Sequence, residues 1–458
     1  MATAHLDSPE NHSFVKRPNR TIIALATPVL FSMIAEPLTG LVDTSFIARL
    51  GAEALAALGV GTAILSGTFW IFNFLGVGSQ TEIAQLWGRQ DKARASQVAG
   101  MALAMALVFG ICISCFGFVL ADRAAALMGA SADSEILTKA VDYMRVRFFA
   151  APAILLTLTS FGILRGLQDM KTPMKVAILV NVINVILDPI FIFGWNAFPA
   201  LGIKGAALST LISQYIGASL CLYSIKLRFP LPEKLQKEDI KGLIKIGGDL
   251  FIRTGLLTLF ILLCTREATR AGAESGAAHQ AIRQIWLFTA LFLDSFAITG
   301  QSLIGYFLGA GKVDLARKVA LYIFSWSILT GTFLCATMLA GTNIVINLLV
   351  PTSALALFSS AWVVAAIAQP VNALAFATDG IHWGTGDFGF LRNVMILATG
   401  TGALLLLGLA NAGITIGDGL TTIWTVTAVW ISIRAVFGVT RVFPGFGAAP
   451  LKECTQTN

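Results

Sequence analysis

The sequence predicts an all-α membrane protein with twelve transmembrane helices in two pseudo-symmetric six-helix lobes. Three observations predict it: a high apolar content, a series of long apolar segments and an internal repeat. Of the 458 residues, 56% are hydrophobic and 12% are charged, with a mean hydropathy of +0.78. Soluble domains carry about 25% charged residues, so this composition excludes an ordinary soluble protein. The net charge of +7 lies mostly in the predicted loops and concerns membrane orientation, not nucleic acid.

The apolar segments give the number of spans. A spanning helix needs about 20 apolar residues, and the chain offers twelve such segments. They lie at residues 21–48, 54–80, 95–120, 140–164, 173–195, 203–226, 243–269, 275–308, 316–340, 355–383, 391–411 and 416–438. The expected organisation is a tail (1–20), a first lobe (21–227), a linker (228–241), a second lobe (242–440) and a second tail (441–458).

The internal repeat divides the spans into two halves. "GAEALAAL" from Gly51 matches "GAESGAAH" from Gly272, an offset of 221 residues. "PAILLTLTSFGILRGLQD" from Pro152 matches "PVNALAFATDGIHWGTGD" from Pro370, an offset of 218 residues. Two halves of six helices with the same orientation follow, as in transporters that are built from parallel repeats.

The basic residues favour one orientation of these halves. With the N-terminus inside, 22 of the 32 Lys and Arg residues, Arg434 among them, fall in cytoplasmic segments and 6 in outer segments. Such a bias marks the cytoplasmic side. We expect the plasma membrane, which is the inner membrane in a bacterium, or an organelle membrane in a plant or alga.

Three polar residues interrupt the fifth apolar segment. Asn181, Asn184 and Asp188 in "NVINVILDPI" stand at i, i+3 and i+7, which places them on one face of a helix. Pro189 follows at once and frees a backbone carbonyl nearby. Ionisable residues within a span are costly and indicate function, so this stripe must face protein or water.

The first span offers a partner for Asp188. Glu36 and Asp43 are seven residues apart, and Asp43 comes as late in its span as Asp188 does. The two aspartates should therefore lie at similar depth and form a proton or sodium site, or else a structural hydrogen-bond cluster. At the repeat offsets Asp43 corresponds to Cys264 and Asp188 to Leu406, which confines this carboxylate pair to the first half.

The second half carries its own ionisable residues within spans: Asp249, Arg253, Arg283, Asp294, Asp379 and His382. Asp249 and Arg253 are four residues apart, a spacing that allows an ion pair on one helix. Arg283 and Asp294 share a helix face, and they either form a structural ion pair or line the substrate cavity.

Several stretches resemble one transporter family. "PLTGLVDTSFIARLG", "LRGLQDMKTP", "NVILDPIFIFG", "GIKGAALSTLISQY" and "DGIHWGTGDF" are together similar to the multidrug and toxic compound extrusion (MATE) family, and to its DinF-type branch in particular. The resemblance covers nearly the whole chain. It implies a V-shaped arrangement of the two lobes and export of substrates in exchange for protons or sodium.

The resemblance also assigns site residues. It implies that Asp43, Asn184 and Asp188 couple the ion, that Thr210 supports them, and that Pro28 is a hinge in the first helix. Some archaeal relatives carry an uncharged polar residue where this chain has Glu36, so Glu36 either joins the ion site or binds substrate.

The resulting interpretation is a secondary active exporter with no enzymatic activity, no catalytic residues and no metal site. Drug-like organic cations are the first expectation for its substrate, and the proton is the expected coupling ion. Organic acids such as citrate are the alternative, because Arg253 and Arg283 would suit them; Asn181, Asp294 and Asp379 are further candidates for the substrate cavity. A flippase for lipid-linked precursors and an intramembrane enzyme are two other possible functional classes.

The expected partners are a small molecule and the bilayer. No cofactor beyond H⁺ or Na⁺ and no nucleic acid are expected, and the protein should be a monomer.

The charge bias predicts that both termini lie in the cytoplasm. A reporter that works only in the cytoplasm should be active when fused to Asn458, and one that works only outside should be inactive. Protease added outside the cell should not cleave the fused reporter. An external C-terminus would require an odd number of spans and would contradict two halves of six helices.

Overall fold

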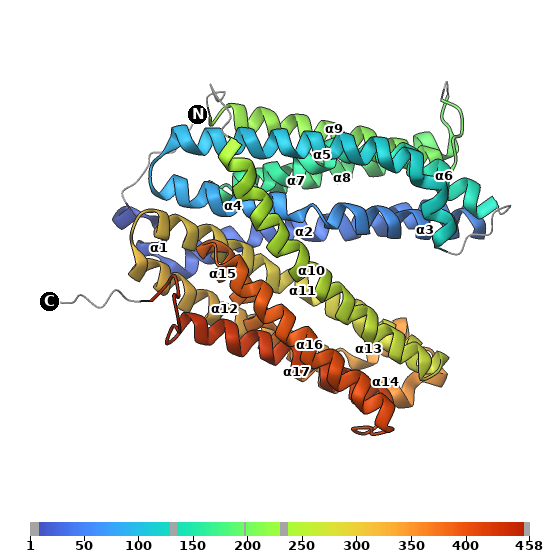
Figure 1. Ribbon diagram of the computed structural model, residues 1–458. Coiled ribbons are helices and arrows are strands. Elements are labelled where there is room, and N and C mark those ends of the chain that lie inside the picture. Colours follow the sequence, from blue (N-terminus) through green and yellow to red (C-terminus); the bar gives the residue numbers. More distant parts are fainter. Residues whose placement is uncertain (1–8, 129–134, 197, 230–236, 453–458) are drawn as a thin grey trace. The chain divides into compact units, whose positions relative to one another are not determined.

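The computed structural model describes residues 9–128, 135–196, 198–229 and 237–452, and this part of the chain is almost entirely helical (Figure 1). It divides into two compact units, Thr27–Gly247 and a second made of Met1–Ala26 with Gly248–Asn458. Half of the expected linker and the outer parts of both expected tails lie outside the described residues.

The first unit contains eight helices: α2 (Pro18–Ala48), which begins in the second unit, α3 (Ala52–Trp70), α4 (Asn73–Gly88), α5 (Lys92–Leu127), α6 (Glu135–Phe148), α7 (Ala151–Gly166), α8 (Lys171–Phe193) and α9 (Ile203–Lys226). A ninth helix, α10 (Lys237–Arg270), runs from the first unit into the second. The remaining elements belong to the second unit: η1 (Pro9–Asn11), α1 (Ser13–Lys16), α11 (Ala273–Gly309), α12 (Val313–Ala340), α13 (Thr342–Leu349), η2 (Thr352–Ala354), α14 (Leu355–Ile367), α15 (Gln369–Thr385), α16 (Phe388–Ala412) and α17 (Gly419–Val442).

The number of membrane spans agrees with the sequence. Within the described ranges, ten helical segments are long and apolar enough to cross a membrane, and two bent helix pairs raise the total to as many as twelve. Each segment or pair overlaps one of the twelve predicted segments. The prediction of an all-helical, multi-pass membrane protein is confirmed.

The two bent pairs occupy equivalent positions in the repeat. α6 and α7 meet at 52°, and the pair formed by η2–α14 with α15 meets at 47°. The second helix of each pair carries a proline in its first turn, Pro152 in α7 and Pro370 in α15. Proline has no N–H to donate and its ring clashes with the preceding turn, so a continuous straight helix cannot form there.

The repeat is also visible in the packing of each unit. α7 packs against α4, α5 and α9, and α15 packs in the same way against α11, α12 and α17. A methyl group added to Gly162 of α7 would lie 2.1 Å from the carbonyl oxygen of Gly76. One added to Gly380 of α15 would lie 2.1 Å from the carbonyl oxygen of Ala297, the equivalent position. Only glycine permits these two helix contacts.

An ion pair closes the end of each repeat. Asp169, just after α7, pairs with Arg228, which follows α9. Asp387, just after α15, pairs with Arg441 near the end of α17 at 2.9 Å. The aspartates are related by the 218-residue offset, so each unit ties the loop after its central helix to its last helix.

The N-terminal residues pack against the second unit. Phe14 of α1 is fully buried and its ring contacts Phe307 and Tyr322. Lys312 pairs with Glu10 at 2.8 Å. The sequence did not predict that this segment, which precedes the first span, belongs with the second half of the chain.

The glycine contact of α15 can be tested by substitution. We predict that Gly380→Ala lowers the stability of the detergent-solubilised protein by about 1–3 kcal/mol, because the new methyl group overlaps backbone of α11. The measurement is the apparent melting temperature by fluorescence-detected gel filtration.

Gly408→Ala in α16 is the matched control, because nothing lies within 4 Å of the added methyl group. It should leave the melting temperature unchanged or raise it, since alanine favours a helix over glycine. Equal melting temperatures for Gly380→Ala and the wild type would contradict the close packing of α11 and α15.

Candidate functional site

A buried polar cluster lies where α8 packs against α9. The Asn184 amide nitrogen is 3.3 Å from Asp188 Oδ1, 3.1 Å from Ser209 Oγ and 3.4 Å from Thr210 Oγ1. The Ser209 hydroxyl also donates to Asp188 Oδ1. Asp188 and Ser209 are fully buried, and Asn184 and Thr210 are buried. The cluster replaces the water that an aspartate loses on burial.

Local sequence positions this cluster. Asn184 and Asp188 are one helical turn apart on α8, so both side chains reach the same side of the helix. A methyl group on Gly205 of α9 would lie 2.3 Å from the Phe191 carbonyl oxygen. The missing side chain at Gly205 therefore lets α9 approach α8 closely enough for Ser209 to bond Asp188.

Asp43 of α2 joins Asp188. The two carboxyl groups lie close enough to share a hydrogen bond if one of them is protonated. One buried oxygen of each, Asp43 Oδ1 and Asp188 Oδ2, receives no hydrogen bond from the residues that the structure describes. A hydrogen bond between two carboxyl groups requires a proton on one of them. Both aspartates stand five residues before the last residue of their helix. This position agrees with the expectation that they lie at a similar depth in the membrane.

The other polar residues of these helices lie apart from the pair. Glu36 is exposed, and within the described part of the chain it has no hydrogen bond or ion pair. Asn181 is half-buried and forms no hydrogen bond with Asn184 or Asp188. Pro28 is buried inside α2 two residues after the boundary between the compact units, and its role as a hinge stays a prediction.

Sequence reasoning missed three residues near the pair. Ser209 precedes the predicted Thr210, and its bond to Asp188 depends on the packing of α8 against α9. Tyr143 and Arg147 lie on α6, within electrostatic range of Asp43. The signal available for Arg147 was an arginine within the predicted span 140–164.

The second unit has a different buried cluster, made of one carboxylate and two guanidinium groups. Asp379 of α15 pairs with Arg253 of α10 and, at 2.8 Å, with Arg434 of α17. All three residues are buried. The charge count placed Arg434 in a cytoplasmic segment; the structure places it within α17, buried against Asp379, which compensates its charge.

Two expected ion pairs of the second half do not form. Asp249 forms an ion pair with Arg392 at 2.5 Å, and Arg253 forms one with Asp379. The predicted pairing of Asp249 with Arg253 is therefore wrong. Arg283 donates to Gln280 at 2.8 Å. Asp294 lies eleven residues further along α11, roughly 16 Å at 1.5 Å per residue, which is too far for an ion pair.

The positions equivalent to the carboxylate pair are apolar or weakly polar. Cys264, equivalent to Asp43, is buried 3.7 Å from Thr427, which is equivalent to Ser209. Leu406, equivalent to Asp188, is buried. The repeat therefore retains the helix packing and loses the carboxyl groups.

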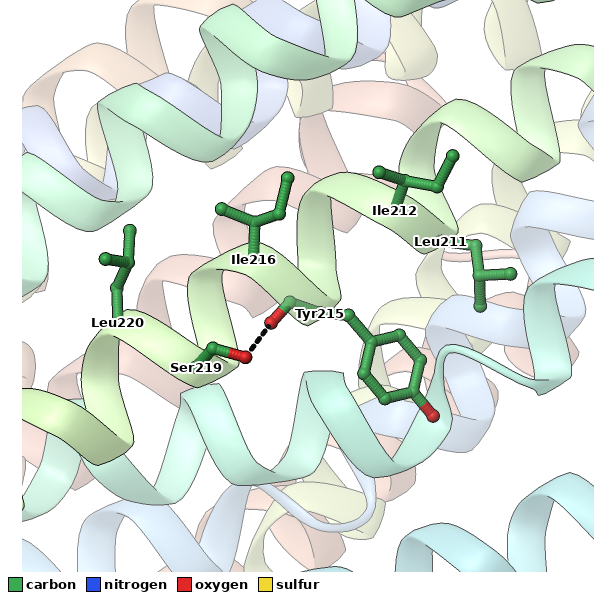
Figure 2. A pocket seen from close by; sticks show the side chains of 6 residues that line it. All are labelled: Leu211, Ile212, Tyr215, Ile216, Ser219 and Leu220. Carbon is green, nitrogen blue, oxygen red and sulfur yellow. Dashed lines mark hydrogen bonds between the residues drawn. The ribbon is translucent and has the colours of Figure 1, made fainter.

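A hollow lies along α9. It is lined by Leu211, Ile212, Tyr215, Ile216, Ser219 and Leu220, which come from this one helix (Figure 2). Tyr215 donates to the Phe149 carbonyl at 3.1 Å and Ser219 to the Tyr215 carbonyl at 2.8 Å. With its hydroxyl groups already bonded, the hollow is an apolar surface and not an ion site.

Comparisons with known proteins agree on one family. A profile of the MatE family matches residues 28–190 and 251–407. "Protein DETOXIFICATION 44, chloroplastic" of Arabidopsis thaliana is 30% identical, over 92% of this chain and 81% of the relative. "DNA damage-inducible protein F" of Escherichia coli is 27% identical, over 93% of this chain and 92% of the relative.

Solved structures share the fold. "Crystal structure of MATE in the bent conformation" matches with a TM-score of 0.84 and 23% identity, over 93% of this chain and 96% of that one. The family consists of transporters, not enzymes, and its relatives include bacterial and plant chloroplast members. The chain belongs to the MatE family and is a multidrug and toxic compound extrusion transporter.

Proposed function

We propose that this transporter exports organic cations in exchange for protons, and that Asp43 and Asp188 form its coupling site. One observation carries the proposal: the two carboxyl groups lie close together inside the unit Thr27–Gly247, each with a buried oxygen that receives no hydrogen bond from the described residues. Like charges in one low-dielectric region cannot both remain ionised cheaply, so the pair binds one proton near neutral pH.

The surroundings of the pair support a proton over sodium. A sodium ion needs several oxygen ligands, as hard cations do. The Asn184 group that faces Asp188 is the amide nitrogen, a donor. Ser209 also donates its hydroxyl to Asp188. Donors stabilise a carboxylate that exchanges a proton, and they occupy the oxygen that a metal ion would need.

The charges also support a cationic substrate. Glu36 is exposed in α2 and lacks an ion pair among the described residues, so it is free to meet a cation. Arg253 and Arg434, which would suit an anion, are buried against Asp379. Arg283 favours the second candidate function, export of an organic acid, because it is half-exposed and bonds only a neutral glutamine.

Protonation would release a cationic substrate by removing negative charge from the site. A cation binds best when the acidic residues of α2 and α8 are ionised, and a proton that enters from outside removes one negative charge. Linkage requires the reverse effect as well: bound cation lowers the affinity for the proton by the same factor.

The identity of the driving ion can be tested with imposed gradients. In proteoliposomes, a pH gradient alone should drive export of a fluorescent organic cation such as ethidium. A sodium gradient with the pH clamped by an ionophore should not. Export driven by sodium and not by the pH gradient would overturn the proton assignment, and export of citrate but not of ethidium would favour the second candidate.

The role of the carboxylate pair can be tested by substitution. Asp43→Asn and Asp188→Asn should each lower proton-driven export at least about a hundredfold, because an amide cannot exchange the proton. Asp122→Asn is the control, since Asp122 is an exposed partner of Arg145 at 2.7 Å. Normal proton-driven export by either pair variant, with normal insertion, would refute the carboxylate mechanism.

A further inference from the structure

Three exposed lysines lie at the ends of two neighbouring helices of the first unit. Lys171 and Lys175 stand one turn apart at the start of α8, and Lys226 is the last residue of α9. All three side chains are exposed, and none forms an ion pair or a hydrogen bond with any described residue. The first turn of α8 contains no acidic residue. The positive charges of these lysines are therefore free to meet a partner from outside the chain.

A set of side-chain contacts holds the two helix ends together. Arg228, two residues after Lys226, bonds Asp169 and lies 3.4 Å from the Thr172 hydroxyl, next to Lys171. The Thr172 backbone N–H in turn donates to Asp169 at 3.0 Å. Since α8 also packs against α9, the lysines of both helices share one end of this helix pair. The three lysines and Arg228 bring four positive charges against the one negative charge of Asp169, a net charge of +3.

The internal repeat shows that the fold does not require these lysines. At the 218-residue offset, the positions of the two α8 lysines become Gly389 and Asn393 of α16, and neither is charged. The basic residue between them, Arg392, already has a partner in Asp249 at 2.5 Å. The second unit thus builds the equivalent helix without a free basic patch, so packing does not explain the lysines of the first unit.

An exposed apolar strip leads along α9 to the same end. The hollow on α9 extends from Leu211 to Leu220 (Figure 2). Tyr223 and Leu227 follow at intervals of three and four residues, which keeps them on one side of the helix, and they are 62% and 66% exposed. Lys226 lies roughly 9 Å along the axis from Leu220, at 1.5 Å per residue. A continuous apolar surface therefore ends at a cluster of positive charge.

We propose that this surface binds an anionic phospholipid, with the lipid phosphate at Lys171, Lys175 and Lys226 and an acyl chain in the hollow along α9. The charge bias of the sequence assigns this end of the helices to the cytoplasm. Anionic lipids give the cytoplasmic leaflet its negative surface potential, and basic pockets between transmembrane helices on that side bind acidic head groups. The inference concerns a second ligand and depends on neither the coupling ion nor the exported substrate.

Charge and shape together identify the occupant. A zwitterionic lipid would bring its own positive group to the lysines, so it gains less from the net charge of the patch. A soluble anion would meet the lysines but would leave the apolar strip in contact with other lipids. Tyr223 lies one turn before Lys226, and tyrosine is enriched where head groups meet the hydrocarbon region. The combination favours a ligand that has both an anionic head group and a chain.

The test is a titration of the purified protein in detergent, followed by native mass spectrometry and by the apparent melting temperature. The additives are phosphatidylglycerol, phosphatidylcholine with the same chains, and inorganic phosphate. Wild type should bind phosphatidylglycerol at least about tenfold more tightly than phosphatidylcholine. The double variant Lys171→Gln/Lys175→Gln should lose about tenfold in affinity for phosphatidylglycerol, because two attractive charges are removed. Inorganic phosphate should leave the melting temperature unchanged.

Two further variants separate the patch from the hollow. Lys241→Gln/Lys245→Gln on α10 is the matched control, because these lysines are also exposed, four residues apart and without a partner among the described residues. It should keep the affinity of wild type within about twofold. Ser219→Phe fills the hollow and removes only a bond to the Tyr215 carbonyl of the same helix. It should weaken binding of phosphatidylglycerol and keep the preference over phosphatidylcholine.

The proposal fails if the two double lysine variants bind phosphatidylglycerol equally, or if wild type binds both lipids equally. Stabilisation by inorganic phosphate as large as that by phosphatidylglycerol would indicate a site for small anions and would also overturn it. Unchanged affinity in Ser219→Phe would contradict an acyl chain in the hollow. All of these substitutions change exposed side chains, so each variant should fold and give a clear result.

Discussion

A carboxylate buried in a membrane protein needs a group that replaces water, and this requirement shapes both units. Asp188 of the first unit is fully buried and has Asn184, Ser209 and the carboxyl group of Asp43 as partners. Asp379 of the second unit instead lies between two arginines. A carboxyl pair changes its charge when a proton arrives, whereas an arginine pair stays charged. The difference in partners therefore separates a site that can couple an ion from one that holds helices together.

Internal duplication explains why the two units pack alike and differ in chemistry. The contacts that depend on shape recur at the same offsets, as Gly162 with Gly76 and Gly380 with Ala297 do. Backbone contact tolerates no side chain on the central helix, so Gly162 of α7 and Gly380 of α15 are both glycine. The polar positions could diverge, because Cys264 and Leu406 fill the space of the carboxyl pair without the cost of a buried charge.

The sequence predicted much of this fold, because its signals are local or repeated. Twelve apolar segments, the helix face shared by Asn184 and Asp188, and the prolines of the equivalent bends could all be read directly. The partners of buried charges could not, since they come from helices far apart in the chain. Arg253 finds Asp379 across 126 residues and prefers it to Asp249, four residues away.

The most direct test of the central claim is to detect the shared proton. Infrared difference spectroscopy on the purified protein, stepped through neutral pH, reports the carbonyl stretch of a protonated carboxyl group. The account predicts one such band at neutral pH that disappears in both Asp43→Asn and Asp188→Asn and remains in Asp122→Asn. A band that survives in both variants of the pair, or its absence from the wild type at every pH near neutral, would contradict the account.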